Sequence, residues 1–161
     1  MKVKILNTLL LGMILTSLMV FMGCSKDKDE ATPDMRAGKV NATITVSDEF
    51  VKADGYSFTV LASGATSISG GFTDWLVNGE KRTGTMIELG TDDFAGGKTI
   101  TLESTKGVIS GLISIQGQAG AVPYTVSYKI EKGDEVRGEG TNEKIQQGQD
   151  PIFMKSADLS N

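Results

Sequence analysis

The sequence predicts an all-β protein built as a single antiparallel β-sandwich, and three observations carry that prediction. Apolar and polar residues alternate with period two in several short segments, as they do in strands that bury one face. Turn-forming pairs such as Asn78-Gly79 separate these segments at short intervals. Glycine supplies 20 of the 161 residues, about 12% against roughly 7% in typical proteins, which fits a turn-rich chain.

The first two alternating segments are residues 39–46 and 56–62. In the first, the even-numbered residues are apolar and the odd-numbered ones are polar, so we expect a half-buried strand. The second repeats the pattern with Tyr56, Phe58 and Val60 on one face. Both segments are therefore predicted to be strands of one core.

Six further segments have the composition of strands. The clearest is 124–131, in which Tyr124, Val126, Tyr128 and Ile130 share one face and polar residues take the other. The Asn78-Gly79 pair predicts a hairpin turn, because both residue types tolerate positive φ. No stretch after residue 23 has apolar spacing typical of a three-turn helix. The other five segments are 66–70, 72–78, 85–89, 98–104 and 108–117.

The last part of the chain is more polar. Residues 135–150 contain few apolar side chains, so we expect a return strand after the turn at Gly133-Asp134, followed by an exposed loop. Residues 151–156 then close the sheet. Pro151 lacks an amide donor, so it should begin that strand or lie on an edge.

The amino-terminal segment has the features of an export signal. Lys2 and Lys4 precede residues 5–23, which contain no charged residue, and small residues end the run. The only cysteine, Cys24, follows Gly23 directly. This arrangement resembles the signal of bacterial lipoproteins, which are cut after a small residue and acylated on the next cysteine. The resemblance implies signal cleavage at Gly23 and lipidation of Cys24, although Phe21 and Met22 depart from the usual motif.

An uncleaved signal anchor is the alternative, since roughly 20 apolar residues can span a bilayer. After Cys24, residues 25–37 are charged and small, which predicts a flexible tether. Its start, SKDKDE, also resembles the charged signal that directs some Bacteroidota-type lipoproteins to the outer face of the outer membrane. The predicted domains are a signal peptide (1–23), an acylated cysteine with a linker (24–38) and the sandwich (39–161).

The sandwich loosely resembles immunoglobulin-like domains. Their third strand often carries a buried tryptophan, and Trp75, the only tryptophan, lies on a mid-chain segment that ends in a hairpin turn. A late strand with tyrosines, as in residues 124–135, is also typical of them. The paired cysteines of antibody domains are absent. This resemblance implies a shape and no activity.

Several classes of function are disfavoured by composition. One cysteine cannot form an internal disulfide, and a chain without histidine has no imidazole for a thiolate or a zinc site. We therefore expect no metal site and no cofactor, and the oxygen-rich loop at Asp92 and Asp93 lacks the ligand spacing of an EF-hand. Removal of residues 1–23 would move the formal charge from −4 to −6, which disfavours nucleic-acid binding. The adjacent acidic pairs are expected to be solvated rather than catalytic.

Aromatic residues are the candidates for ligand contact. Flat rings stack on the apolar face of a sugar, and Trp75, Tyr56 and Tyr124 are the rings we single out. Core packing is the other interpretation, because Tyr124 shares a face with Val126 and Trp75 lies beside Leu76.

The function predicted from these features is that of a lipid-anchored cell-envelope protein, a non-enzymatic binding or surface-display module. It would contact the membrane through acyl chains on Cys24, in the outer membrane with its domain either periplasmic or at the cell surface, and take a protein or glycan ligand. The alternative is a structural subunit of a pilus-like or envelope assembly, and Arg36 lies where the maturing cut of a pilus-like subunit would fall.

Overall fold

The computed structural model describes residues 36–51, 53, 55–150 and 152–161. The expected signal peptide and most of the linker, with Gly23, Cys24 and also Pro151, lie outside the described residues. Within these residues no helix is long and apolar enough to cross a membrane. The elements are β1 (Val40–Val46), β2 (Ser57–Ala65), β3 (Trp75–Val77), β4 (Glu80–Arg82), β5 (Met86–Leu89), α2 (Thr91–Phe94), β6 (Thr99–Ser104), β7 (Ser110–Gln118), β8 (Tyr124–Lys132), β9 (Glu135–Ile145) and β10 (Phe153–Asp158).

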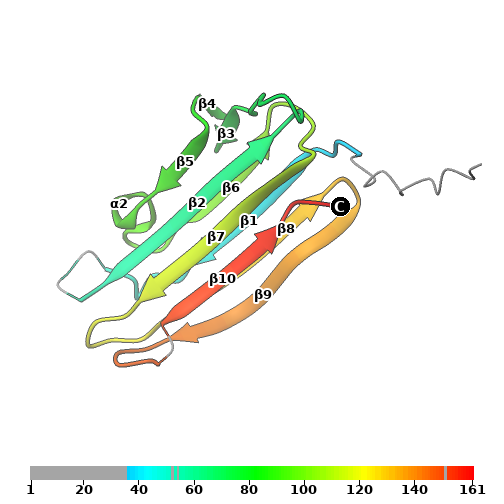
Figure 1. Cartoon of the computed structure of the whole chain (residues 1–161). Coiled ribbons are helices and arrows are strands. Elements are labelled where there is room, and N and C mark those ends of the chain that lie inside the picture. Colours follow the sequence, from blue (N-terminus) through cyan, green and yellow to red (C-terminus); the bar gives the residue numbers. More distant parts are fainter. Residues whose placement is uncertain (1–35, 52, 54, 151) are drawn as a thin grey trace, which may run out of the picture. The chain divides into compact units, whose positions relative to one another are not determined.

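The strands form two antiparallel sheets that pack face to face (Figure 1). The six-stranded sheet has the order β4-β3-β6-β1-β8-β9, and the four-stranded sheet has the order β10-β7-β2-β5. One continuous cluster of buried apolar side chains from both sheets lies between them. The predicted fold class, an all-β antiparallel sandwich, is confirmed.

The buried faces of the strands follow the predicted alternation. In β1 and β8 the apolar residues of each period-two pattern are buried, and their polar neighbours point away from the core. Val40 pairs with Lys132 and Val46 pairs with Val126, so the two strands are held in register along their length. The predicted turn at Asn78-Gly79 joins β3 to β4, and Asn78 has a φ of 50°.

Two segments differ from their predictions. Residues 66–70, predicted as a strand, form a turn in which the Ser67 hydroxyl accepts a hydrogen bond from the Gly71 amide and Gly70 has a φ of +100°. Residues 135–145, predicted as a short return strand and a loop, form the single 11-residue strand β9. This strand is polar because it lies at an edge of its sheet, pairs only with β8 and buries little.

The strand directions define two ends of the sandwich. The chain enters at Gly38, whose amide and carbonyl bond to Val108, and this entry end also holds the β8–β9 turn and the carboxyl terminus. The distal end holds the β1–β2, β5–β6, β7–β8 and β9–β10 connections (Figure 1, lower left). Because β1 runs from the entry end to the distal end, these loops lie a full strand length from Gly38.

Candidate binding surfaces

The three aromatic candidates occupy different positions. Trp75 on β3 is fully buried, and Tyr124 on β8 is 1% exposed. Tyr56 is partly buried and packs against the core. Burial raises the pKa of the Tyr124 phenol well above its usual value. Of the three rings, only Tyr56 therefore offers surface to a ligand, and Trp75 and Tyr124 pack as core residues.

Five aromatic rings form a cluster beneath the distal loops. Phe50 lies at its centre, with its ring centroid 4.8 Å from that of Tyr124 and 6.2 Å from those of Tyr56 and Phe58. Phe58 in turn meets Phe94 of α2 edge to face at 4.7 Å. Such tilted and edge-on pairs contribute beyond the area that they bury. The cluster therefore joins the β1–β2 connection, α2 and β8 into one firm base.

Tyr56 also fixes the β7–β8 loop. Its hydroxyl accepts a hydrogen bond from the Val122 amide at 2.8 Å and donates one to the Val122 carbonyl at 3.0 Å. Its ring lies against Gly120, where a Cβ atom would collide with it. Three of the distal connections each carry an exposed apolar side chain: Val51 at 46%, Val122 at 52% and Ile152 at 56%. The distal end thus presents apolar tips on an ordered base.

At the entry end, Lys132 holds the carboxyl-terminal residues in place. It is 5% exposed, and its ammonium group donates to the carbonyl oxygens of Ile109 and Leu159 at 3.2 and 2.6 Å. A third bond, of 2.7 Å, goes to Oδ1 of Asn161. Burial lowers the pKa of this ammonium group. The sequence carried a signal for this position, since Lys132 continues the inward-facing series from Tyr124 to Ile130.

Arg137 reinforces the same segment. It donates to the Ser160 carbonyl at 2.7 Å and to Oδ1 of Asn161 at 3.3 Å, and it forms a 2.9 Å ion pair with Glu135. A cavity of about 720 Å³ lies beside these groups. Because both cations already bond to protein oxygens, the arrangement is suited to holding the chain terminus rather than to binding an anion.

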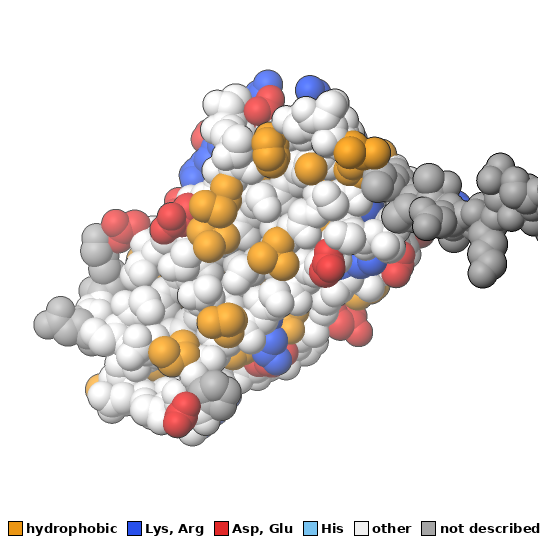
Figure 2. Space-filling view, viewed as in Figure 1, with side chains coloured by type: hydrophobic (Ala, Val, Ile, Leu, Met, Phe, Trp, Pro, Cys, Tyr) orange, Lys and Arg blue, Asp and Glu red, His pale blue; other side chains and the backbone are white. Residues whose placement is uncertain are grey.

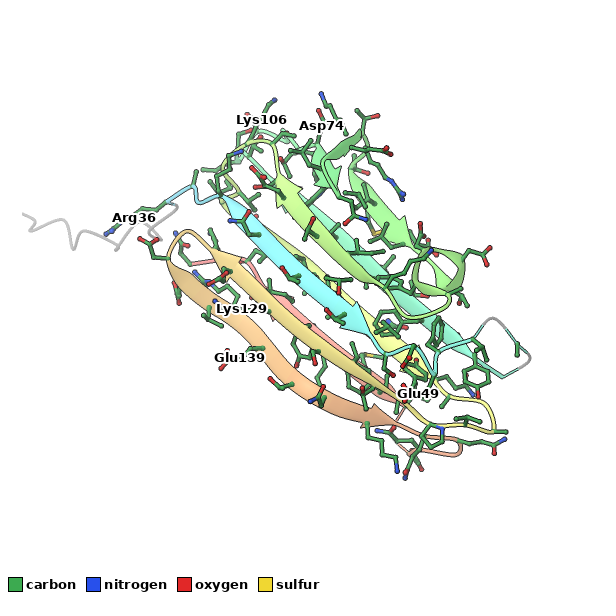
Figure 3. The ribbon with its side chains drawn as sticks, turned by 180° about the vertical axis from the view of Figure 1, so that it is seen from behind. Arg36, Glu49, Asp74, Lys106, Lys129 and Glu139 are labelled. Atoms are coloured by element: carbon green, nitrogen blue, oxygen red, sulfur yellow. The ribbon has the colours of Figure 1, made fainter. Side chains whose placement is uncertain are left out.

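The two outer faces of the sandwich differ in charge. On the six-stranded sheet, Lys129 lies opposite Glu139 in register and forms a 2.6 Å ion pair with Glu131 (Figure 3). The outer face of the four-stranded sheet carries small polar and apolar side chains across its centre, and Figure 2 shows charges mainly toward its margins. Its two outward charges, Glu88 and Asp158, lie on the edge strands β5 and β10.

The acidic pair considered for calcium has a local structural role. Asp92 and Asp93 lie in the first turn of α2, and Asp93 accepts a hydrogen bond from the Gly90 amide at 2.8 Å. Asp93 also pairs with Arg82 of β4 at 3.5 Å. Among the described residues, no group of three or more His, Cys, Asp or Glu side chains is placed to hold a metal ion.

Comparison with known proteins bears on the fold. No family model and no curated protein matches the chain. A solved structure does: the crystal structure, at 2.52 Å resolution, of a DUF4425 family protein from Bacteroides ovatus ATCC 8483. The two chains are 9% identical, and the match covers 78% of this chain and 98% of the other with a TM-score of 0.52. At that identity the likeness supports the sandwich fold alone.

Proposed function

We propose that the protein is a lipid-anchored component of a bacterial cell envelope and that its sandwich is a non-enzymatic binding module with the distal end as its ligand surface. The anchor is the acylated Cys24, after cleavage at Gly23, and residues 25–37 supply reach. The outer membrane is the membrane we infer, because of the charged segment that follows Cys24.

The separation of the two ends is the observation that carries this proposal. Gly38 and Arg36, whose carbonyl accepts a hydrogen bond from Asn161, lie at the entry end, whereas Val51, Val122 and Ile152 lie in the distal connections. Figure 3 labels Arg36 and Glu49 at opposite ends of the strands. A chain held through residues before Gly38 would therefore present the distal loops away from its attachment. Loops supported by a rigid sandwich are a common location for recognition.

A protein ligand fits the distal end better than a glycan. The exposed apolar side chains named there are aliphatic, and the rings of Phe50 and Tyr124 are turned into the core. Sugar recognition by stacking needs an open ring face, and only Tyr56 retains part of one. Exposed aliphatic side chains of this kind are suited to contact with an apolar part of a protein surface.

The alternative, a pilus-like subunit, requires an open sheet edge that accepts a neighbour's strand. The edge strands of the six-stranded sheet are of the kind that resists such pairing. β4 has three residues, all charged, and β9 is irregular, with two register shifts against β8 and several charged side chains. Strand addition at the six-stranded sheet is therefore disfavoured, and we favour the binding module.

The ligand surface is tested with Val122→Asp and Val51→Asp, beside Val136→Asp as the matched control. Val136 is 45% exposed on β9 near the entry end, so all three changes add one charge at an exposed valine. Full-length variants are compared on a glycan array and in pulldowns of envelope proteins from the same cells. Binding that only the two distal variants lose would support the proposal, and equal loss with Val136→Asp would contradict it. SDS-resistant ladders that vanish with Arg36→Ala would favour the assembly alternative.

A further inference from the structure

We propose that the outer face of the four-stranded sheet is a self-association surface, on which a second copy of the chain docks about a two-fold axis parallel to the strands. The occupant is a second copy because the pattern of large and small side chains on this face is complementary to itself. This inference does not depend on the lipid anchor or on the distal ligand surface.

The strand register arranges the outward side chains in rows across β10, β7, β2 and β5. One row is Asp158, Leu112, Ser63 and Met86, and the next is Ser156, Ser114, Leu61 and Glu88. A third row begins with Met154, Gln116 and Thr59. The interleaved residues of the same strands, such as Ile113 and Val60, point into the core.

A two-fold axis parallel to the strands places β7 of one copy over β2 of the other. Positions along the strands are unchanged by this rotation, so each row faces the same row of the second copy. Leu112 then faces Ser63 of the second copy, and Leu61 faces Ser114. The large side chain meets a small one in both pairs, as layers that interdigitate require. Facing sheets related in this way can adopt the aligned packing that sheet twist favours.

The same axis keeps like charges apart. Glu88 on β5 comes to face Ser156, and Asp158 on β10 comes to face Met86, so neither carboxylate opposes the other. Lys155, also on β10, points instead toward β9, where it pairs with Glu143 at 2.7 Å. The centre of the interface is therefore free of charge, which is typical of the buried part of protein interfaces.

The area of the outer face of the four-stranded sheet sets the expected affinity of the dimer. β2 and β7 have nine residues each, β10 has six and β5 has four. With about 4.8 Å between strands and about 3.3 Å per residue, two such faces bury about 900 Å² in total. This is below the roughly 1,200 Å² of stable complexes, so the dimer should be weak and depend on concentration. The axis also leaves both entry ends on the same side, which is compatible with two copies anchored in one membrane as proposed above.

The decisive experiment exchanges one large and one small residue within a row. The full chain is isolated from the cell fraction that contains it, and its self-association is followed by sedimentation velocity over a concentration series. Leu112→Ser leaves a gap and Ser63→Leu opposes two leucines, so each should raise the dimer dissociation constant about tenfold or more. The double variant, Ser63→Leu with Leu112→Ser, again sets a leucine opposite a serine and should recover most of the lost affinity.

Leu112→Lys provides a second disruptive change at a side chain that is 44% exposed, and Leu76→Lys, at a half-buried leucine on the outer face of the six-stranded sheet, is its control. Thermal unfolding checks that every variant folds. Cys24→Ala should leave the dissociation constant unchanged, which separates this result from the fate of the proposed anchor. A wild-type chain that stays monomeric, an exchange variant that is folded but not restored, or equal disruption by Leu76→Lys would overturn the proposal. So would a monomer that binds a different protein through Leu112.

Discussion

The distal and entry ends of the sandwich are stabilised by different chemistry. At the distal end, Phe50, Phe58 and Tyr124 pack ring against ring, and one hydroxyl, that of Tyr56, fixes a loop. At the entry end, Lys132 and Arg137 donate to backbone carbonyl oxygens of the terminal residues. The ring contacts at the distal end involve no cationic donor, whereas the bonds at the entry end come from ionised side chains and depend on their charge state. The end that presents loops is thus expected to keep its form across conditions in which the entry end loosens.

The largest expected effect is the loss of the central ring of the distal cluster. Phe50→Ala removes a fully buried side chain that contacts three other aromatic rings, so the free energy of unfolding should fall by about 3–5 kcal/mol. Urea unfolding of the full chain measures the change. Val51→Ala, at the exposed neighbour, should stay within about 0.5 kcal/mol of wild type. A loss below about 1 kcal/mol for Phe50→Ala would mean that the cluster is not what supports the loops.

A smaller loss is expected at the entry end. Lys132→Met keeps the apolar stem but removes the donor to three oxygens, two of which are carbonyls of Ile109 and Leu159. Leaving such acceptors unpaired costs about 1–3 kcal/mol. Hydrogen exchange of the Leu159 amide, which bonds to the Gly111 carbonyl, should accelerate with it. Lys106→Met, at an exposed lysine of the same end, is the control, and an equal effect there would refute a specific role for Lys132.

Removal of the Tyr56 hydroxyl should have a local effect. Tyr56→Phe breaks both bonds to Val122 and should cost about 0.5–1.5 kcal/mol, with faster exchange of the Val122 amide. Tyr128→Phe removes a hydroxyl that bonds instead to Glu143, so it should leave Val122 exchange unchanged. Unaltered exchange in Tyr56→Phe would show that the loop is held by the cluster alone.

The smallest effect is a pH dependence at the entry end. The Asp158 carboxylate accepts a hydrogen bond from the Ser160 amide at 2.8 Å, which lowers its pKa. A carboxyl whose folded pKa is depressed adds stability above its unfolded value of about 3.9, and that stability is lost as the pH falls through the folded pKa. The difference in Tm between wild type and Asp158→Asn should therefore shrink on acidification. Ser160→Pro removes the donor and should reproduce the trend, and a constant difference would contradict it.

The sequence predicted the fold where strands bury one face. The alternation in β1 and β8 identified the core residues because burial on one side imposes period two. It failed for β9, an edge strand whose polar residues leave no such pattern, and for residues 66–70, where alternating serine and isoleucine occur in a turn. The pattern of apolar and polar residues does not distinguish an edge strand from a turn. It reports which side chains are buried, whereas strands are defined by backbone hydrogen bonds.

The candidate binding surfaces were harder to predict from the sequence than the fold. The aromatic candidates were identified by residue type, and the structure places two of them, Trp75 and Tyr124, in the core. The bond between Tyr56 and Val122 joins residues 66 positions apart, and no local pattern signals it. The rows across β7 and β2 depend on strand register, which was not deduced from the segments themselves. Lys132 was the exception. It continues the alternating series of inward-facing residues in β8, so its burial could have been predicted from the sequence.

Acylation of Cys24 is the central feature of the proposed function, and one measurement tests it directly. The intact mass and membrane partition of the native protein are compared with those of Cys24→Ala. We expect the native protein in the membrane fraction, with a mass equal to residues 24–161 plus acyl chains, and we expect the variant to be lost from that fraction. An uncleaved and unmodified chain that stays in the membrane would make residues 5–23 a membrane anchor and would contradict the lipoprotein proposal.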